Sequence, residues 1–184
     1  MKRILLAITI LACSTSVYAF WPKPYVSVNA GYGYTDVAAS NPHNYNRQQD
    51  GVAWGGNVGM LFNNYFGAEM GYNQLANTEL NGSDYIRNPR VVDVALKGIY
   101  HGDEGYDFFA KAGVGQESFK YPSAQYIRKY VPVFAVGADY EITPHVLVNV
   151  TANATVAMGD NNGGEFPNRA PALYWGTAGV SYVF

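Results

Sequence analysis

Hydrophobic and polar residues alternate with a period of two along most of the chain after residue 20. In residues 25–34, for example, the even positions are apolar or aromatic and the odd positions are small or polar. A period of two is typical of a β-strand whose two faces meet different surroundings, whereas an amphipathic helix repeats every 3.6 residues. The pattern predicts eight strands, over residues 25–34, 52–62, 66–73, 92–100, 108–117, 134–142, 148–156 and 174–184.

The two faces of the predicted strands differ in charge and in side-chain size. The apolar face carries no charged residue, and the other face combines a few charges with many Gly, Ser, Thr and Asn residues. Charged residues make up 14% of the chain, against about 25% in soluble domains. A face so small and so poor in charge suits the narrow interior of an eight-stranded barrel. Strands of roughly 9–11 residues are also long enough to cross a bilayer at a tilt.

Aromatic residues on the apolar faces gather near the strand ends, with aliphatic residues between them. One predicted girdle comprises Tyr32, Tyr34, Trp54, Tyr72 and Tyr174. The other comprises Phe62, Phe66, Tyr100, Phe108, Tyr140, Tyr182 and Phe184. Two aromatic belts around an aliphatic band are typical of transmembrane barrels.

The connections between the predicted strands alternate in length. Three are short, namely residues 63–64, 101–106 and 143–145, and four are long, namely 35–51, 74–90, 118–131 and 157–171. Short periplasmic turns and long outer loops are typical of bacterial outer-membrane barrels. We therefore predict an all-β fold: a monomeric, eight-stranded antiparallel up-and-down transmembrane β-barrel with both termini in the periplasm. A soluble lipocalin-like ligand-binding barrel, with its apolar face turned inward, is the alternative.

The first residues predict export from the cytoplasm. Positive residues at Met1-Lys2-Arg3 precede an apolar stretch over 4–12, and Val17-Tyr18-Ala19 provides a cleavage site. We expect a signal peptide over residues 1–19 and a barrel domain over residues 20–184. Cys13, the single cysteine, leaves lipidation at a lipoprotein box as an alternative to removal with the signal.

Several segments resemble the OmpA-like outer-membrane β-barrel family. The similarity lies in Asn63-Asn64-Tyr65-Phe66-Gly67-Ala68-Glu69-Met70-Gly71-Tyr72, Val94-Ala95-Leu96-Lys97-Gly98 and Phe109-Ala110-Lys111-Ala112-Gly113-Val114-Gly115. The resemblance implies an outer-membrane location and insertion by the barrel-assembly machinery, for which Val180, Tyr182 and Phe184 would form the C-terminal signal. Two-domain relatives carry a peptidoglycan-binding domain after the barrel, and the sequence ends at Phe184. Anchoring to the cell wall is therefore not carried over from those relatives.

The charged residues of the polar face are expected to fill the barrel. The polar face carries Glu69, Asp93, Lys97, Lys111, Glu117, Asp139 and Glu141, and the predicted interior network comprises all of them except Glu117. Four of these residues lie about four positions from a short turn and would share one level of the barrel: the acids Glu69 and Asp139 and the bases Lys97 and Lys111. Buried charges persist when they are paired, so we predict a structural salt-bridge layer that plugs the lumen. A gate or ion path is the functional alternative.

The long loops are the expected place of any individual function. Lys120, Tyr126, Arg128 and Lys129 combine basic and aromatic side chains that would bind lipopolysaccharide phosphates or a host or envelope protein. A simple solvated loop is the alternative. The formal net charge of −2 and pI of 5.9 give no reason to expect nucleic-acid binding.

An enzymatic role is not expected, although some small outer-membrane barrels modify lipid A. Such chemistry requires a serine, a histidine and an acid within reach of one another. Only His43 lies in an outer loop, with Ser40 and Asp50 nearby, whereas His101 and His145 fall in periplasmic turns. The sequence shows no metal-ligand cluster and no cofactor motif. We predict a structural or surface-interaction role, for which the sequence specifies no loop partner.

Overall fold

The computed structural model describes residues 22–36, 47–48, 50–80, 83–102, 105–120, 126–156 and 170–184. The ten strands found there are β1 (Lys23–Asp36), β2 (Arg47–Gln48), β3 (Asp50–Leu61), β4 (Phe66–Leu75), β5 (Thr78–Leu80), β6 (Ser83–His101), β7 (Tyr106–Lys120), β8 (Tyr126–Thr143), β9 (Val146–Thr155) and β10 (Ala172–Val183). Among the described residues, no helix is long and apolar enough to cross a membrane. The expected signal peptide and Cys13 lie outside the described residues.

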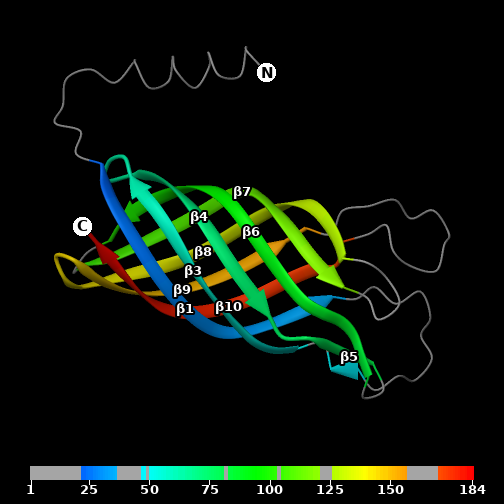
Figure 1. The fold of residues 1–184 in the computed structure, drawn as a ribbon. Helices are drawn as coiled ribbons and strands as arrows, with labels where there is room; N and C mark the ends of the chain where they lie inside the picture. Colours follow the sequence, from blue (N-terminus) through cyan, green and yellow to red (C-terminus); the bar gives the residue numbers. More distant parts are fainter. Residues whose placement is uncertain are drawn as a thin grey trace, which may run out of the picture.

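The eight long strands β1, β3, β4, β6, β7, β8, β9 and β10 form a barrel, as Figure 1 shows. β1 pairs with both β3 and β10, and the ladder continues around both sides until β6 meets β7. All the pairings are antiparallel. The short strands β2 and β5 extend the sheet beside the first part of β6. The eight-stranded antiparallel barrel expected from the sequence is confirmed.

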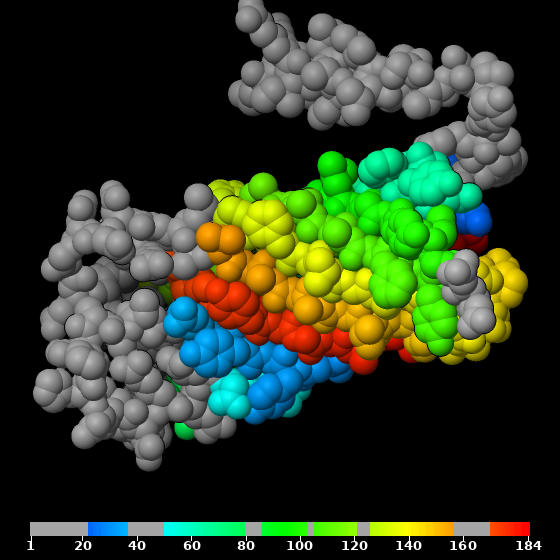
Figure 2. Space-filling model, turned by 180° about the vertical axis from the view of Figure 1, so that it is seen from behind, coloured from blue at the N-terminus to red at the C-terminus, as the bar shows by residue number. Residues whose placement is uncertain are grey.

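Apolar side chains cover the outside of the barrel and charged ones lie within it. On β6, the exposed fractions of Val94 and Leu96 are 54% and 68%, whereas Asp93 and Lys97 are each 6% exposed. Figure 2 shows the outer surface over β1 in blue and over β8, β9 and β10 in yellow to red. Exposing so many large apolar groups to water would be unfavourable, and lipid removes that cost. This orientation contradicts the soluble-barrel alternative.

The aromatic residues expected in the two girdles lie on the outer surface. Tyr32, Trp54 and Tyr174 are exposed towards the end that carries the long loops. Phe66, Tyr100 and Phe108 are exposed towards the end that carries the short turns. Tyr72 and Phe62 are half-buried. The outer surface therefore has the layered arrangement of a transmembrane barrel.

Two of the predicted long loops are largely strand, so their expected boundaries are wrong. Residues 74–90 contain β5 and the first part of β6, and residues 118–131 contain the end of β7 and the start of β8. These strands continue beyond the apolar band, where the outward positions are polar or basic. Hydrophobic alternation therefore ends before the backbone pairing does. Asn88, with φ of 51°, marks an irregularity where the β6–β7 register shifts between Arg87 and Arg90.

Candidate functional site: the barrel lumen

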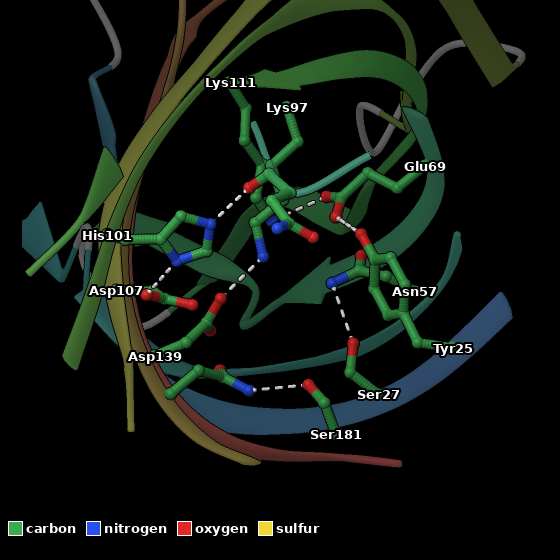
Figure 3. Close-up of polar contacts among 12 residues, drawn as sticks. Tyr25, Ser27, Asn57, Glu69, Lys97, His101, Asp107, Lys111, Asp139 and Ser181 are labelled. Atoms are coloured by element: carbon green, nitrogen blue, oxygen red, sulfur yellow. Dashed lines mark hydrogen bonds and ion pairs between the residues drawn. The ribbon is translucent and has the colours of Figure 1, made fainter. Parts of the chain in front are cut away.

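Two interleaved ion pairs cross the lumen near the short-turn end (Figure 3). Lys97 Nζ on β6 lies 2.7 Å from Asp139 Oδ2 on β8. Lys111 Nζ on β7 lies 2.6 Å from Glu69 Oε1 on β4. The neighbouring order is β4, β6, β7 and β8, so each lysine bypasses the adjacent strand. The pairs therefore fasten four consecutive strands together from the inside.

The two lysines stand directly opposite each other in the β6–β7 ladder. Like charges in that position repel, so each ammonium group requires its own carboxylate. Further contacts surround them: Tyr25 donates a hydrogen bond of 2.5 Å to Glu69 Oε2. The Phe109 ring centre lies 4.1 Å from Lys97 Nζ and 4.8 Å from Lys111 Nζ, within cation–π distance. The charges are thus both paired and solvated by the protein.

Glycines on the inner face provide space for the large rings at this level. A Cβ on Gly59 would overlap the ring of Tyr25, and a Cβ on Gly137 would overlap the ring of Phe109. Because the interior of an eight-stranded barrel is narrow, a large side chain on one strand requires a glycine at the adjacent position of the neighbouring strand. This explains much of the glycine content of the polar face.

A second polar level lies deeper in the lumen, around Asp93. This residue is 6% exposed and faces a cavity of about 20 Å³ that Asn29, Asn57 and Asn73 also line. A space of that size holds about one water molecule. Asn57 donates a hydrogen bond of 3.1 Å to Ser27, so the amides link this level to β1. Polar side chains thus line the space at this level.

An apolar cluster occupies the lumen near the long-loop end, where the sequence pattern does not predict one. Its members are Ala53, Leu75, Ile86, Val91, Phe119, Val131, Val133, Ala170, Leu173 and Trp175. The signal was present, because residues 91–92 and 131–134 are apolar on consecutive positions and depart from the strict alternation. The interior therefore has a level with two ion pairs, a polar level around Asp93 and an apolar level.

Glu117 lies at the apolar level and is fully buried. Neither carboxyl oxygen has a hydrogen-bond partner within the part of the chain that the structure describes. Lys129 is directly opposite in the β7–β8 ladder, but its ammonium group forms no ion pair with Glu117 among the described residues. An unpartnered buried carboxyl group destabilises the fold. Glu117 thus differs from the paired acids below it.

Replacing Glu117 by leucine is expected to raise the free energy of unfolding by about 1–3 kcal/mol, because it removes an unsatisfied group from an apolar cluster. The same change at Glu69 is expected to lower it by about 3–5 kcal/mol, because Lys111 loses its partner. Reversible denaturation in phospholipid vesicles measures both variants. Destabilisation of similar size in the two variants would contradict the difference in their surroundings.

The remaining predicted residues fall in several places. Glu141 keeps the inward register of Asp139 but is exposed near the short-turn end of β8, so it is not part of the buried charged level that the sequence predicts. Lys120, Tyr126 and Arg128 are exposed outside. Lys129 has the inward register of Glu117 and is only partly exposed.

The C-terminal residues Val180, Tyr182 and Phe184 face outward, with exposed fractions of 47%, 45% and 63%. The Tyr182 and Phe184 rings meet edge to face at 5.0 Å. Their accessibility suits recognition from the lipid side. Their recognition by the assembly machinery stays a prediction.

The described histidines are engaged at the short-turn end. His101 contacts Asp107 through Nδ1 at 2.6 Å and the Asn64 carbonyl oxygen through Nε2 at 2.6 Å. His145 Nδ1 lies 2.8 Å from the Val183 carbonyl oxygen. His43 lies outside the described residues. Within the described ranges, no three His, Cys, Asp or Glu side chains gather in a way that suits a metal ion.

Comparisons with known proteins agree with this architecture. The family model described as the OmpA-like transmembrane domain matches residues 22–184. A search of curated protein sequences finds no match.

Solved structures share the fold at low sequence identity. The N-terminal β-barrel domain of Pseudomonas aeruginosa OprF is 11% identical, with a TM-score of 0.57, and the alignment covers 88% of this chain and 97% of that one. Neisserial surface protein A is 14% identical, with a TM-score of 0.60 and coverage of 88% and 97%. Ail of Yersinia pestis, in complex with the heparin analogue sucrose octasulfate, is 10% identical, with a TM-score of 0.52 and coverage of 89% and 99%. The match over residues 22–184 establishes that the chain belongs to the OmpA-like transmembrane domain family and is a β-barrel of the outer membrane.

Proposed function

We propose that this protein is a closed, non-conducting barrel whose individual role is surface interaction at the long-loop end. The observation that supports the proposal is the filling of the lumen. Two crossed ion pairs occupy one level, and the apolar cluster around Phe119 and Trp175 occupies another. An eight-stranded barrel is only wide enough for side chains, and here large ones occupy both ends of its interior.

If the interior is closed, any specific role is carried by the surfaces outside the membrane. Loops held by a rigid scaffold are the usual carriers of binding function. The Ail barrel, which has the same fold, has been solved in complex with a heparin analogue. In this chain, β6 and β8 of 19 and 18 residues extend the sheet towards the long loops. Such an extension would hold the loops outside the membrane. A host or envelope protein could then reach them.

A role without catalysis fits the positions of the described histidines better than lipid A modification does. His101 and His145 lie at the short-turn end, on the periplasmic side of the proposed topology. Lipid A lies in the outer leaflet, at the other end. Mass spectra of lipid A are therefore expected to stay unchanged when the protein is overproduced, and a new lipid A species would contradict a non-enzymatic role.

Planar bilayer recordings test the closed interior. The purified, refolded barrel is expected to show no steady conductance, because ions would have to cross both the charged level and the apolar level. A stable, large open channel would contradict the proposal.

A parallel pull-down tests the surface role with two forms of the protein. The full chain is compared with a barrel in which residues 37–46, 121–125 and 157–169 are replaced by short turns. Capture of a partner by the full chain alone supports the proposal. Equal capture by both forms, or by neither, would contradict a role carried by the loops.

A further inference from the structure

Positive charge is concentrated on one part of the outer surface. Of the ten Lys and Arg residues that follow Phe20, five lie on β6, β7 and β8 towards the long loops: Arg87, Arg90, Lys120, Arg128 and Lys129. Arg87, Lys120 and Arg128 are exposed, and Arg90 is half-buried. Lys129 has the inward register. Four of the five therefore lie on or near the outer face of three neighbouring strands.

Two of these arginines share one row of the sheet. Arg90 on β6 pairs with Ser118 on β7, which pairs with Arg128 on β8. Backbones two strands apart are separated by roughly 10 Å, so both side chains can reach one group above Ser118. Ser118 is only 5% exposed although its register is outward, as expected if the flanking side chains cover it. We call Arg90, Ser118 and Arg128 the arginine row.

Lys120 and Tyr126 border the arginine row on its outer side. They pair with each other across β7 and β8, one step further towards the long loops. The Arg90 guanidinium carbon lies 5.5 Å from the ring centre of Tyr126, a cation–π contact that directs the arginine towards β8. The row is thus positioned by the sheet and by an aromatic ring, and a further cation is one step away.

The depth of the arginine row coincides with the edge of the apolar surface. The next row inward is Val92, Gln116 and Tyr130, and the one after that is Val94, Val114 and Pro132. Val92 and Val94 are 44% and 54% exposed. A basic row two residues from exposed valines lies where hydrocarbon gives way to headgroups. Outward positions from Arg90 to Leu96, Val114 to Lys120 and Tyr126 to Val136 carry no carboxylate to neutralise it.

We propose that the arginine row, with Lys120, binds a phosphate group of lipopolysaccharide in the outer leaflet. Planar guanidinium groups bind phosphate through paired, charge-assisted hydrogen bonds. A phosphate at this depth belongs to a molecule whose acyl chains lie against Val92 and Val94, which favours a glycolipid over a soluble polyanion. The inference rests on the proposed outward orientation of the long-loop end. It replaces Lys129 of the sequence prediction with Arg90.

The test compares two double variants of the full chain in detergent micelles, and both remove two positive charges. Arg90→Gln/Arg128→Gln changes the arginine row, and Lys23→Gln/Lys129→Gln is the matched control at sites outside it. The probes are a deep-rough lipopolysaccharide that carries the lipid A phosphates and the same molecule after enzymatic dephosphorylation. Slower migration of boiled than of unboiled protein in gels confirms that each variant is folded.

The arginine variant is expected to bind the phosphorylated lipopolysaccharide about 10- to 100-fold more weakly than the unchanged protein. The control is expected to stay within about threefold, and dephosphorylation is expected to weaken binding to the unchanged protein but not to the arginine variant. Equal losses in both variants, or no effect of dephosphorylation, would overturn the proposal. Stronger binding of a soluble sulfated oligosaccharide than of the glycolipid would assign the row to a soluble polyanion instead. None of these outcomes alters the conductance or loop-deletion results, so failure here is separate from failure of the proposed function.

Discussion

Lys97→Met is expected to lower the free energy of unfolding by about 3–5 kcal/mol, because it leaves the buried Asp139 carboxylate without its cation. The side chains of Lys97 and Asp139 are each only 8% exposed, so solvent cannot replace the lost partner. The loss also removes the closest cation–π contact with Phe109. Denaturant titration of the barrel in phospholipid vesicles, followed by tryptophan fluorescence, measures the change.

Lys97→Met/Asp139→Leu is the control for this prediction. Removing both members of a buried ion pair leaves no unpaired charge, so this double variant is expected to recover most of the lost stability. A Lys97→Met variant within about 1 kcal/mol of the unchanged protein would be the result for a pair accessible to solvent. It would contradict a buried charged level.

Val94→Arg is expected to destabilise the barrel by about 2–4 kcal/mol, the cost of a positive charge near the bilayer midplane on the lipid-facing surface. Val94 is 54% exposed and lies midway along β6 between Arg90 and Tyr100. In water, an exposed valine could be exchanged for arginine at little cost. The predicted loss therefore depends on lipid around this position.

Tyr100→Arg provides the matched comparison on the same strand. Tyr100 is 72% exposed and lies in the girdle at the short-turn end, where the same charge is expected to cost about 0–1 kcal/mol. Equal effects at Val94 and Tyr100, measured by denaturation in the same vesicles, would argue against a dependence on depth.

The barrel itself was predictable because each transmembrane strand meets lipid on one face and packed side chains on the other. This contrast produces the period of two in residues 25–34 and in its seven counterparts. Where the contrast ends, the sequence signal ends as well. The outer parts of β6 and β8 have polar outward positions, such as Arg90 and Arg128, so the sequence pattern predicts loops there although the backbones are paired.

The lumen was only partly predictable, because alternation specifies the face of a residue and not its partner. The sequence placed Glu69, Lys97, Lys111 and Asp139 at one level. The choice of partners depends on the diameter and curvature of the barrel, which bring together strands that are not neighbours in the sheet. Those two properties appear only once the closed structure is known.

For other interior residues, the alternation of polar and apolar positions does not predict which side chains surround them. Tyr25 and Phe109 join the charged level although neither side chain is charged. Glu117 looked like any other acid of the polar face, and its isolation depends on Phe119, Val131 and other side chains that fill the lumen around it. The sequence feature that indicates the apolar level is the presence of apolar residues at inward positions, where the strict alternation is locally broken.

The orientation of the two strand faces is the central claim, and site-directed spin labelling tests it most directly. Cys13 is the only cysteine in the sequence, so single-cysteine variants can be made in a Cys13→Ser background. In vesicles, labels at Val94, Leu96 and Val136 are predicted to collide often with oxygen, which partitions into hydrocarbon, and rarely with a water-soluble nickel chelate. Labels at Ala95 and Ala135, which are buried in the lumen, are predicted to be poorly accessible to both. High oxygen accessibility at Ala95 and Ala135, with protection at Val94 and Leu96, would contradict the account.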